Sequence, residues 1–267
     1  MSPFGYTMLG FGGGKNQTFT AVSEDIPTGA ETEFAAHYSN SPNSDWISAD
    51  KFIAIWSADD DAPAYVGRSI VGSVSGTSIS FGSMAHYSSN RAYQMAVASD
   101  PFNDDKFVVI FENNSSAGHG TAVVGTVSGT TPSYGTEVAF ETGGACRDLN
   151  IDFDPNTENK FVVSYKDVGN SNYGTAIVGT ISGTSVSFGT AVVFNSAGTY
   201  HTDVAYDSNQ TGVFVISYKD SGNSSYGTAV AGTVSGTSIS FETPVVFTGT
   251  RAIVSTAIDF DPNTENK

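Results

Sequence analysis

The sequence has one cysteine and no long apolar run. Cys146 has no second cysteine with which to form a disulfide or a metal knuckle, so we expect a tolerated small residue there rather than a nucleophile. No stretch approaches the roughly 20 apolar residues of a membrane span, and the N-terminus lacks the basic and apolar regions of a signal peptide. The sequence therefore predicts neither a membrane span nor signal-peptide secretion.

Basic residues are also scarce. Lys and Arg total 11 against 27 Asp and Glu, which gives a formal net charge of −16. A nucleic-acid binder needs clustered positive charge to neutralise phosphates, and this chain lacks it. We therefore expect no nucleic-acid partner. An acidic, hydroxyl-rich surface does suit a protein that stays soluble outside a cell.

Helical periodicity is the third feature that is missing. No segment repeats apolar residues at the helical period, whereas 29 glycines and a background rich in Ser, Thr and Asn favour short strands joined by tight turns. With 267 residues, of which 39% are apolar, the chain can bury a substantial core. The composition predicts an all-β fold.

An internal repeat organises this β-rich chain. The pattern is a glycine, a second glycine five residues on, a third four residues on, and an aromatic residue after five more. It starts at Gly5, Gly67, Gly120, Gly174 and Gly227. We predict a single repeat domain, 1–267, with copies at 5–66, 67–119, 120–173, 174–226 and 227–267. Residues 258–267 repeat 151–160 exactly, so we expect the last copy to be incomplete, lacking its final strand.

Each copy holds four strand-like runs, which in the fourth copy are 175–181, 185–194, 201–206 and 213–218, separated by short polar turns. The run 161–165 in the preceding copy is apolar on both alternating faces, as expected for a sheet stacked between two neighbours. We predict a β-propeller of about five four-stranded blades, the last one incomplete. A β-solenoid-like array is the alternative.

Few residues have the spacing of a chemical site. Asp152, Asp154 and Glu158 are spaced like calcium ligands, but only the Asp at position 154 recurs in the other copies, which favours a structural Asx turn. We therefore expect no cofactor or metal, with Ca²⁺ as the weaker alternative. The segment 165–173 is similar to the Asp box of sialidase-type propellers, with altered spacing and no Trp. No catalytic set accompanies the histidines, which are His37, His86, His119 and His201.

The copies differ most in the connections between their second and third strands, at 84–93, 141–148, 195–202 and 248–255. Varied loops on a repeated scaffold are candidate contact surfaces. The predicted ligand-binding residues are Arg91, Tyr93, Arg147, Tyr200, His201 and Arg251. Arg and Tyr side chains there could grip a glycan or an acidic partner group. Drift in unconstrained loops is the competing explanation.

Segments 120–129, 217–227 and 236–241 resemble repeats of large virion and tail-fibre-like proteins of marine bacteriophages, and the likeness covers about residues 67–267. The resemblance implies a virion structural or host-attachment role and offers no catalytic residues to carry over. We predict a non-enzymatic propeller that contacts cell-surface glycan or other virion proteins. The predicted location is a virion or the extracellular space, with the cytoplasm as the alternative. A sialidase-like glycan-processing enzyme is the alternative function.

Overall fold

The computed structural model describes residues 39–58 and 65–261, and this part of the chain is built almost wholly from β-strands. The start of the first copy, including Gly5 and His37, lies outside the described residues. Among the described residues no helix is long and apolar enough to span a membrane. The strands are β1 (Ser39–Trp46), β2 (Lys51–Ala58), β3 (Val66–Ser75), β4 (Ser78–Phe81), β5 (Ala85–Ser99), β6 (Lys106–Asn113), β7 (His119–Ser128), β8 (Thr131–Tyr134), β9 (Val138–Glu141), β10 (Cys146–Phe153), β11 (Lys160–Asp167), β12 (Tyr173–Ser182), β13 (Ser185–Phe188), β14 (Val192–Tyr206), β15 (Val213–Asp220), β16 (Tyr226–Ser235), β17 (Ser238–Phe241) and β18 (Val245–Val246).

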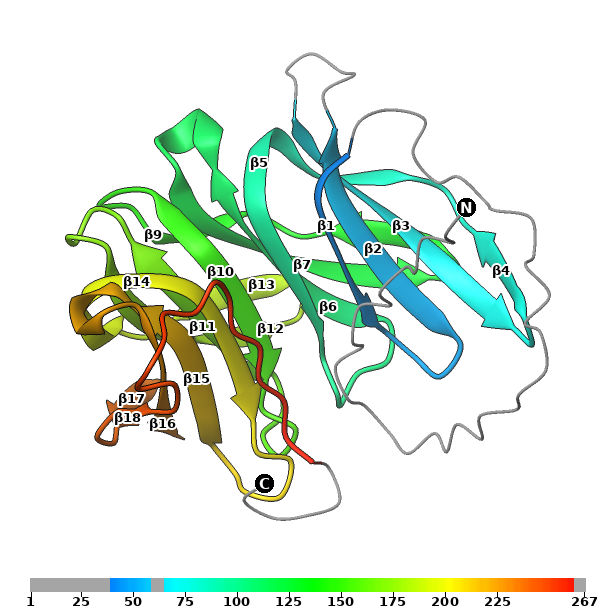
Figure 1. The fold of residues 1–267 in the computed structure, drawn as a ribbon. Helices are drawn as coiled ribbons and strands as arrows, with labels where there is room; N and C mark the ends of the chain where they lie inside the picture. The colour runs from blue at the N-terminus through cyan, green and yellow to red at the C-terminus, as the bar shows by residue number, and fades with distance from the viewer. Residues whose placement is uncertain (1–38, 59–64, 262–267) are drawn as a thin grey trace, which may run out of the picture.

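These strands pair antiparallel throughout and form four successive sheets. The sheets begin with β1, the second half of β5, β10 and the second half of β14, and each continues with the next two strands along the chain. Two short segments then pair with opposite ends of the third strand, as β4 and the start of β5 pair with β3. The sheets stand side by side in an open arc (Figure 1). This antiparallel, propeller-like arrangement contradicts the β-solenoid alternative.

The sheets are offset from the sequence copies. Strands β10 and β11 come from the copy predicted at 120–173, but β12 and β13, which complete their sheet, belong to the next copy. Likewise β16, β17 and β18 complete the fourth sheet instead of starting an incomplete one, which corrects our assignment of the last blade. The described sheets do not close into a ring, so a count of five blades stays a prediction.

Both faces of the inner sheets are buried, as the sequence predicted. Phe161, Val163 and Tyr165 of β11 pack toward the second sheet, in a core that includes Val108 and Ile110 of β6. The alternate residue, Val162, packs toward the fourth sheet. Burying one such aromatic or aliphatic side chain stabilises the fold by about 1.5–3 kcal/mol. Contact between neighbouring sheets therefore stabilises the fold.

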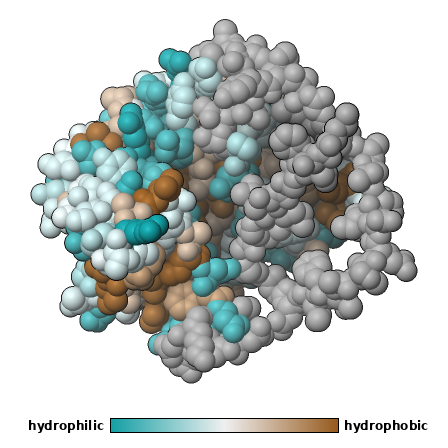
Figure 2. Space-filling view, in the orientation of Figure 1, coloured by the Kyte–Doolittle hydropathy of each residue, from teal (hydrophilic) through white to brown (hydrophobic). Residues whose placement is uncertain are grey.

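The outer face of the fourth sheet is less covered. Val215 of β15 occupies the position of Val162 in β11, but it is half-buried where Val162 has no exposure. Val245, Val246 and Phe247 are exposed near the edge of the same sheet. Figure 2 shows apolar surface gathered where β17 and β18 lie in Figure 1. The face that is buried between earlier sheets is therefore partly open at the last one.

The repeated glycine and aromatic pattern reflects packing within each sheet. Gly179 of β12 stands directly opposite Phe161 of β11, and a Cβ at position 179 would lie 2.0 Å from Cζ of that ring. The patterned aromatic, Phe188, meets Phe161 edge-on at 6.0 Å between ring centroids. The third glycine, Gly183, has a φ of +63° in the turn that follows β12. The second glycine therefore makes room for the ring, and the third allows the turn.

Side-chain carboxylates tie the first strands of successive sheets together. An oxygen of Asp45 accepts a hydrogen bond of 2.7 Å from the Ser99 N–H, and Asp152 accepts one of the same length from the Tyr206 N–H. Asp203 accepts one of 2.6 Å from the Ile258 N–H, which lies in the segment after β18. The first strands thus lie next to one another, and the cavity described next opens among them.

Candidate functional site

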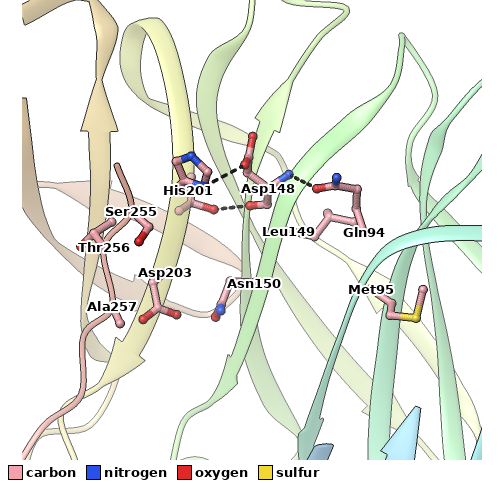
Figure 3. Close-up of a pocket in the computed structure, with 11 residues that line it drawn as sticks. Gln94, Met95, Asp148, Leu149, Asn150, His201, Asp203, Ser255, Thr256 and Ala257 are labelled. Carbon is pink, nitrogen blue, oxygen red and sulfur yellow. Dashed lines mark hydrogen bonds and ion pairs between the residues drawn. The ribbon is translucent and has the colours of Figure 1, made fainter. Parts of the chain in front are cut away.

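A cavity of about 370 Å³ lies where the first strands of the second, third and fourth sheets meet the segment after β18 (Figure 3). Its lining is mainly polar and comes from four neighbouring chain segments. The lining residues are Gln94, Met95, Asp148, Leu149, Asn150, His201, Thr202, Asp203, Ser255, Thr256 and Ala257. Polar groups from segments far apart in sequence thus converge on one space, as expected of a binding site.

A bulge at one position of the repeat aims side chains at this cavity. Gln94, Asp148 and His201 each have a positive φ, of 47°, 51° and 52°, and each sits where the register of its strand shifts. Residues other than glycine adopt this backbone at a cost, and a β-bulge redirects a side chain. Ser255 follows 54 residues after His201 and also lines the cavity. One repeat position therefore supplies an amide, a carboxylate, an imidazole and a hydroxyl.

The backbone N–H, the carbonyl and both carboxylate oxygens of Asp148 each have a partner. Its N–H donates to Gln94 Oε1 at 3.1 Å, and its carbonyl accepts a short hydrogen bond from Thr202 Oγ1. In its carboxylate, Oδ2 lies 2.6 Å from Lys166 Nζ and Oδ1 lies 3.7 Å from His201 Nδ1. Since only 14% of the side chain is exposed, this carboxylate has a fixed position facing the cavity.

Lys166 reaches Asp148 from β11, the neighbouring strand of the same sheet. Its side chain is 8% exposed, and its Nζ lies 4.1 Å from the centre of the Tyr200 ring. An ammonium over an aromatic face is attracted by the electron density of the ring. The cation is thus held between a carboxylate and a ring, with little access to water.

Asp203 is the second carboxylate in the cavity, and its surroundings differ from those of Asp148. Burial raises the pKa of Asp203 above its usual range, and the nearby Asp259 carboxylate adds to this, while hydrogen bonds from the backbone N–H groups of Ile258 and Val204 oppose it. Among the described residues Asp203 forms no ion pair with a basic side chain. The cavity therefore combines a carboxylate paired with a cation and a second carboxyl group whose pKa is raised by burial.

The acidic spacing around Asp154 proves to be a turn. Asp154 Oδ1 accepts the Asn156 N–H at 2.8 Å, as in an Asx turn, and Oδ2 accepts the Gly212 N–H of the next sheet. Asp207 makes the same turn with the Asn209 N–H. Within residues 39–58 and 65–261, no group of three acidic, His or Cys residues is arranged to hold a metal ion.

Cys146 lies buried at the start of β10. Burial raises the pKa of its thiol well above the usual range, and neighbouring carboxylates, with Glu141 foremost, raise it further. The group therefore stays a thiol, whereas a nucleophile would have to be a thiolate.

Of the six predicted ligand-binding residues, only His201 lines the cavity. Tyr93, Arg147 and Tyr200 stand one position before the three bulges in consecutive first strands, so they are brought to the same end of the sheets. Arg147 is 54% exposed, with its Nε 4.0 Å from Glu112 Oε1.

The other two predicted residues are also absent from the cavity lining. Arg91 lies 5.6 Å from the centre of the Tyr65 ring, which in turn contacts the Tyr93 ring at 5.2 Å. Arg251 is exposed in the segment after β18. A ligand-binding role for the six residues stays a prediction.

Sequence reasoning missed the residues that give the cavity its charge, which are Asp148, Lys166 and Asp203. The varied connection predicted from the sequence ends at Asp148, and the binding residues predicted there are Arg, Tyr and His residues of the connections in which the copies differ. A comparison of position 148 with positions 94, 201 and 255 would have revealed one repeat position carrying four different polar groups.

No protein-family model matches the sequence, and a search of characterised proteins gave no match. Among solved structures, the chain is similar to an α-L-arabinanase from Penicillium chrysogenum complexed with arabinobiose, with 18% identity and a TM-score of 0.46, over 76% of this chain and 60% of that one. An exo-β-1,3-galactanase from Phanerochaete chrysosporium with galactose has 11% identity and a TM-score of 0.47, over 79% and 50%. A thermostable family-43 glycoside hydrolase has 10% identity and a TM-score of 0.38, over 75% and 73%. The match thus spans about half of the galactanase and 60% of the arabinanase.

These comparisons contradict our prediction of a non-enzymatic attachment protein, because the similar structures are of carbohydrate-processing enzymes. None of them relates the chain to a virion. The two carboxylates of the cavity, Asp148 and Asp203, stand in strands β10 and β14 of the repeat. With TM-scores below 0.5, no residue role or substrate is carried over from these enzymes.

Proposed function

We propose that the cavity binds part of a glycan and that the protein hydrolyses a glycosidic bond there. One observation carries the proposal: Asp148 and Asp203 line the same cavity in opposite electrostatic surroundings. Glycoside hydrolysis ordinarily needs one carboxyl group that gives a proton to the leaving oxygen and one ionised carboxylate. Surroundings that favour different protonation states are how two chemically identical groups are divided between these roles.

The roles follow from the contacts of each residue. Asp203, whose raised pKa favours the protonated form, would donate the proton to the glycosidic oxygen. Asp148, ion-paired with Lys166, would act as the ionised carboxylate. Gln94, Asn150 and His201 offer amide and imidazole groups that suit hydrogen bonding to sugar hydroxyls.

The volume and lining of the cavity fit this use. A space of about 370 Å³ is at the small end of ligand pockets, so a short part of a glycan would enter it while the rest stays outside. The exposed Tyr200 ring, beside the cavity residue His201, gives a surface on which a sugar ring could stack.

The test is a turnover assay on aryl glycosides and on polysaccharides, following released phenol or reducing ends. We expect Asp203→Asn and Asp148→Asn each to lower kcat at least about 100-fold, the usual contribution of acid or base catalysis. Asp104→Asn, in an exposed turn that does not line the cavity, is the matched control and should keep full activity. Glycan binding without turnover by the wild type, or full activity of Asp203→Asn, would overturn the proposal.

Action outside the cell remains a prediction. It fits the proposed function, because many polymeric glycans lie outside cells. A ring of five blades likewise remains a prediction, because β12, β16 and the other described strands complete four sheets only.

A further inference from the structure

We infer that Lys166 is a positioning residue, which fixes the direction of the Asp148 carboxylate at the cavity while the Tyr200 ring holds the Lys166 ammonium in place. The inference rests on the proposed function, because it assigns the group that orients a carboxylate which that function requires. Lys166 does not line the cavity and would act only through Asp148.

The contacts of Asp148 single out Lys166 as its main partner. The Nζ to Oδ2 distance of 2.6 Å is that of a charge-assisted hydrogen bond, whereas His201 Nδ1 stands 3.7 Å from Oδ1, beyond good hydrogen-bond length. The Gln94 and Thr202 bonds fix the backbone of Asp148 but leave its carboxylate untouched. Lys166 is therefore the group that orients the carboxylate.

The surroundings of Lys166 make this ion pair stronger than one on the surface. Both side chains are less than 15% exposed, so water screens their attraction only weakly. Charged groups near Lys166 include Glu112 of β6, which interacts with it, and Arg147 of β10, whose Nε lies 4.0 Å from Glu112 Oε1. The shortest ion-pair contact of Lys166 is nevertheless with Asp148, at 2.6 Å.

Tyr200 completes the arrangement from the fourth sheet. Its ring centre lies 4.1 Å from Lys166 Nζ, but 5.9 Å from Nζ of Lys219. Lys219 stands opposite Tyr200 in the strand pairing, just as Lys166 stands opposite Arg147. Two lysines thus share one repeat position, and only Lys166 touches Asp148. Lys219 is therefore a matched control within the same protein.

The direct test follows the Asp148 carboxyl carbon by NMR at constant pH in protein labelled with ¹³C at aspartate, with Asp148→Asn to assign the signal. In Lys166→Met, we expect this signal to move and broaden, because the carboxylate loses the 2.6 Å contact that fixes its direction. Lys166→Arg should restore the wild-type signal, because arginine is also a charged donor, and Lys219→Met should leave the signal unchanged. Tyr200→Ala should broaden the signal less, because Lys166 then loses only the ring that holds its Nζ.

The same variants are then compared in the turnover assay. We expect kcat to fall in Lys166→Met with KM changed less, to recover in Lys166→Arg, and to stay unchanged in Lys219→Met. An unchanged Asp148 signal in Lys166→Met, or in Tyr200→Ala where Lys166→Met does not fold, overturns the role of Lys166. A changed signal in a protein that cleaves no glycan upholds Lys166 and overturns only the proposed function.

Discussion

Substituting Gly179 with alanine tests the packing explanation of the repeat. A Cβ at this position would lie 2.0, 2.3 and 2.6 Å from three carbons of the Phe161 ring, far inside van der Waals contact. The ring is fully buried, and Phe153 and Phe188 lie 5.2 and 6.0 Å away between centroids, so it cannot swing aside without disturbing them. Overpacking of this kind costs about 3 kcal/mol, which in a chain of this size lowers Tm by roughly 6–12 °C.

The assay is urea unfolding followed by circular dichroism, with Gly183→Ala as the matched control. Gly183 has a φ of +63° but has nothing within 4 Å of an added Cβ, so it should lose only about 1 kcal/mol through backbone strain. Combining Gly179→Ala with Phe161→Leu should cost less than the sum of the two single changes, because both act on the same space. A cost for Gly179→Ala no greater than that of Gly183→Ala, or strict additivity with Phe161→Leu, would refute the reasoning.

Three further outcomes are expected. Burial raises the pKa of Asp152 from 3.8 to about 8, so the native chain keeps a proton that the unfolded chain releases. This carboxyl therefore favours folding most below pH 4, and its contribution is lost as the pH rises through about 8. The free energy of unfolding should accordingly fall less between pH 5 and pH 9 in Asp152→Asn than in the wild type, and equal falls would contradict this. Tyr134→Phe should lower the free energy of unfolding by about 1 kcal/mol in urea titrations, because it removes a 2.6 Å bond to Ser69 Oγ of the first sheet; no loss would show that the bond contributes nothing net. Cys146 should react with a thiol reagent in urea but not in buffer, and rapid labelling of the native protein would refute its burial.

Much of the fold could be predicted because the repeat records local packing. Gly179, opposite Phe161, and Gly183, in the turn, are each required by packing or backbone geometry within one sheet. Equivalent glycines therefore recur in every copy of the sheet. The apolar alternation of residues 161–165 likewise reports burial on both faces. The division of strands among sheets could not be predicted, because a run of strands joined by turns does not show which connection joins two sheets.

The site was harder to predict than the fold, since it depends on neighbours that the pattern does not show. The bulges at Asp148 and His201 are not marked by glycine or proline, and their positive φ is visible only in the structure. Lys166 is one residue beyond a buried apolar run and looks like an ordinary strand end. Its importance comes from Asp148 and Tyr200, which belong to a different strand and a different sheet.

The offset between copies and sheets has a consequence for how such an array could grow by duplication. A duplicated segment of 53 or 54 residues carries the closing strands of one sheet and the opening strands of the next, so a copy alone completes neither. When such a segment is inserted between two copies, however, its strands pair with strands of the copies before and after it, so no unpaired strand edge is created. The gain or loss of one whole segment is thus easy to accommodate, whereas ending the chain at a copy boundary leaves strands without partners.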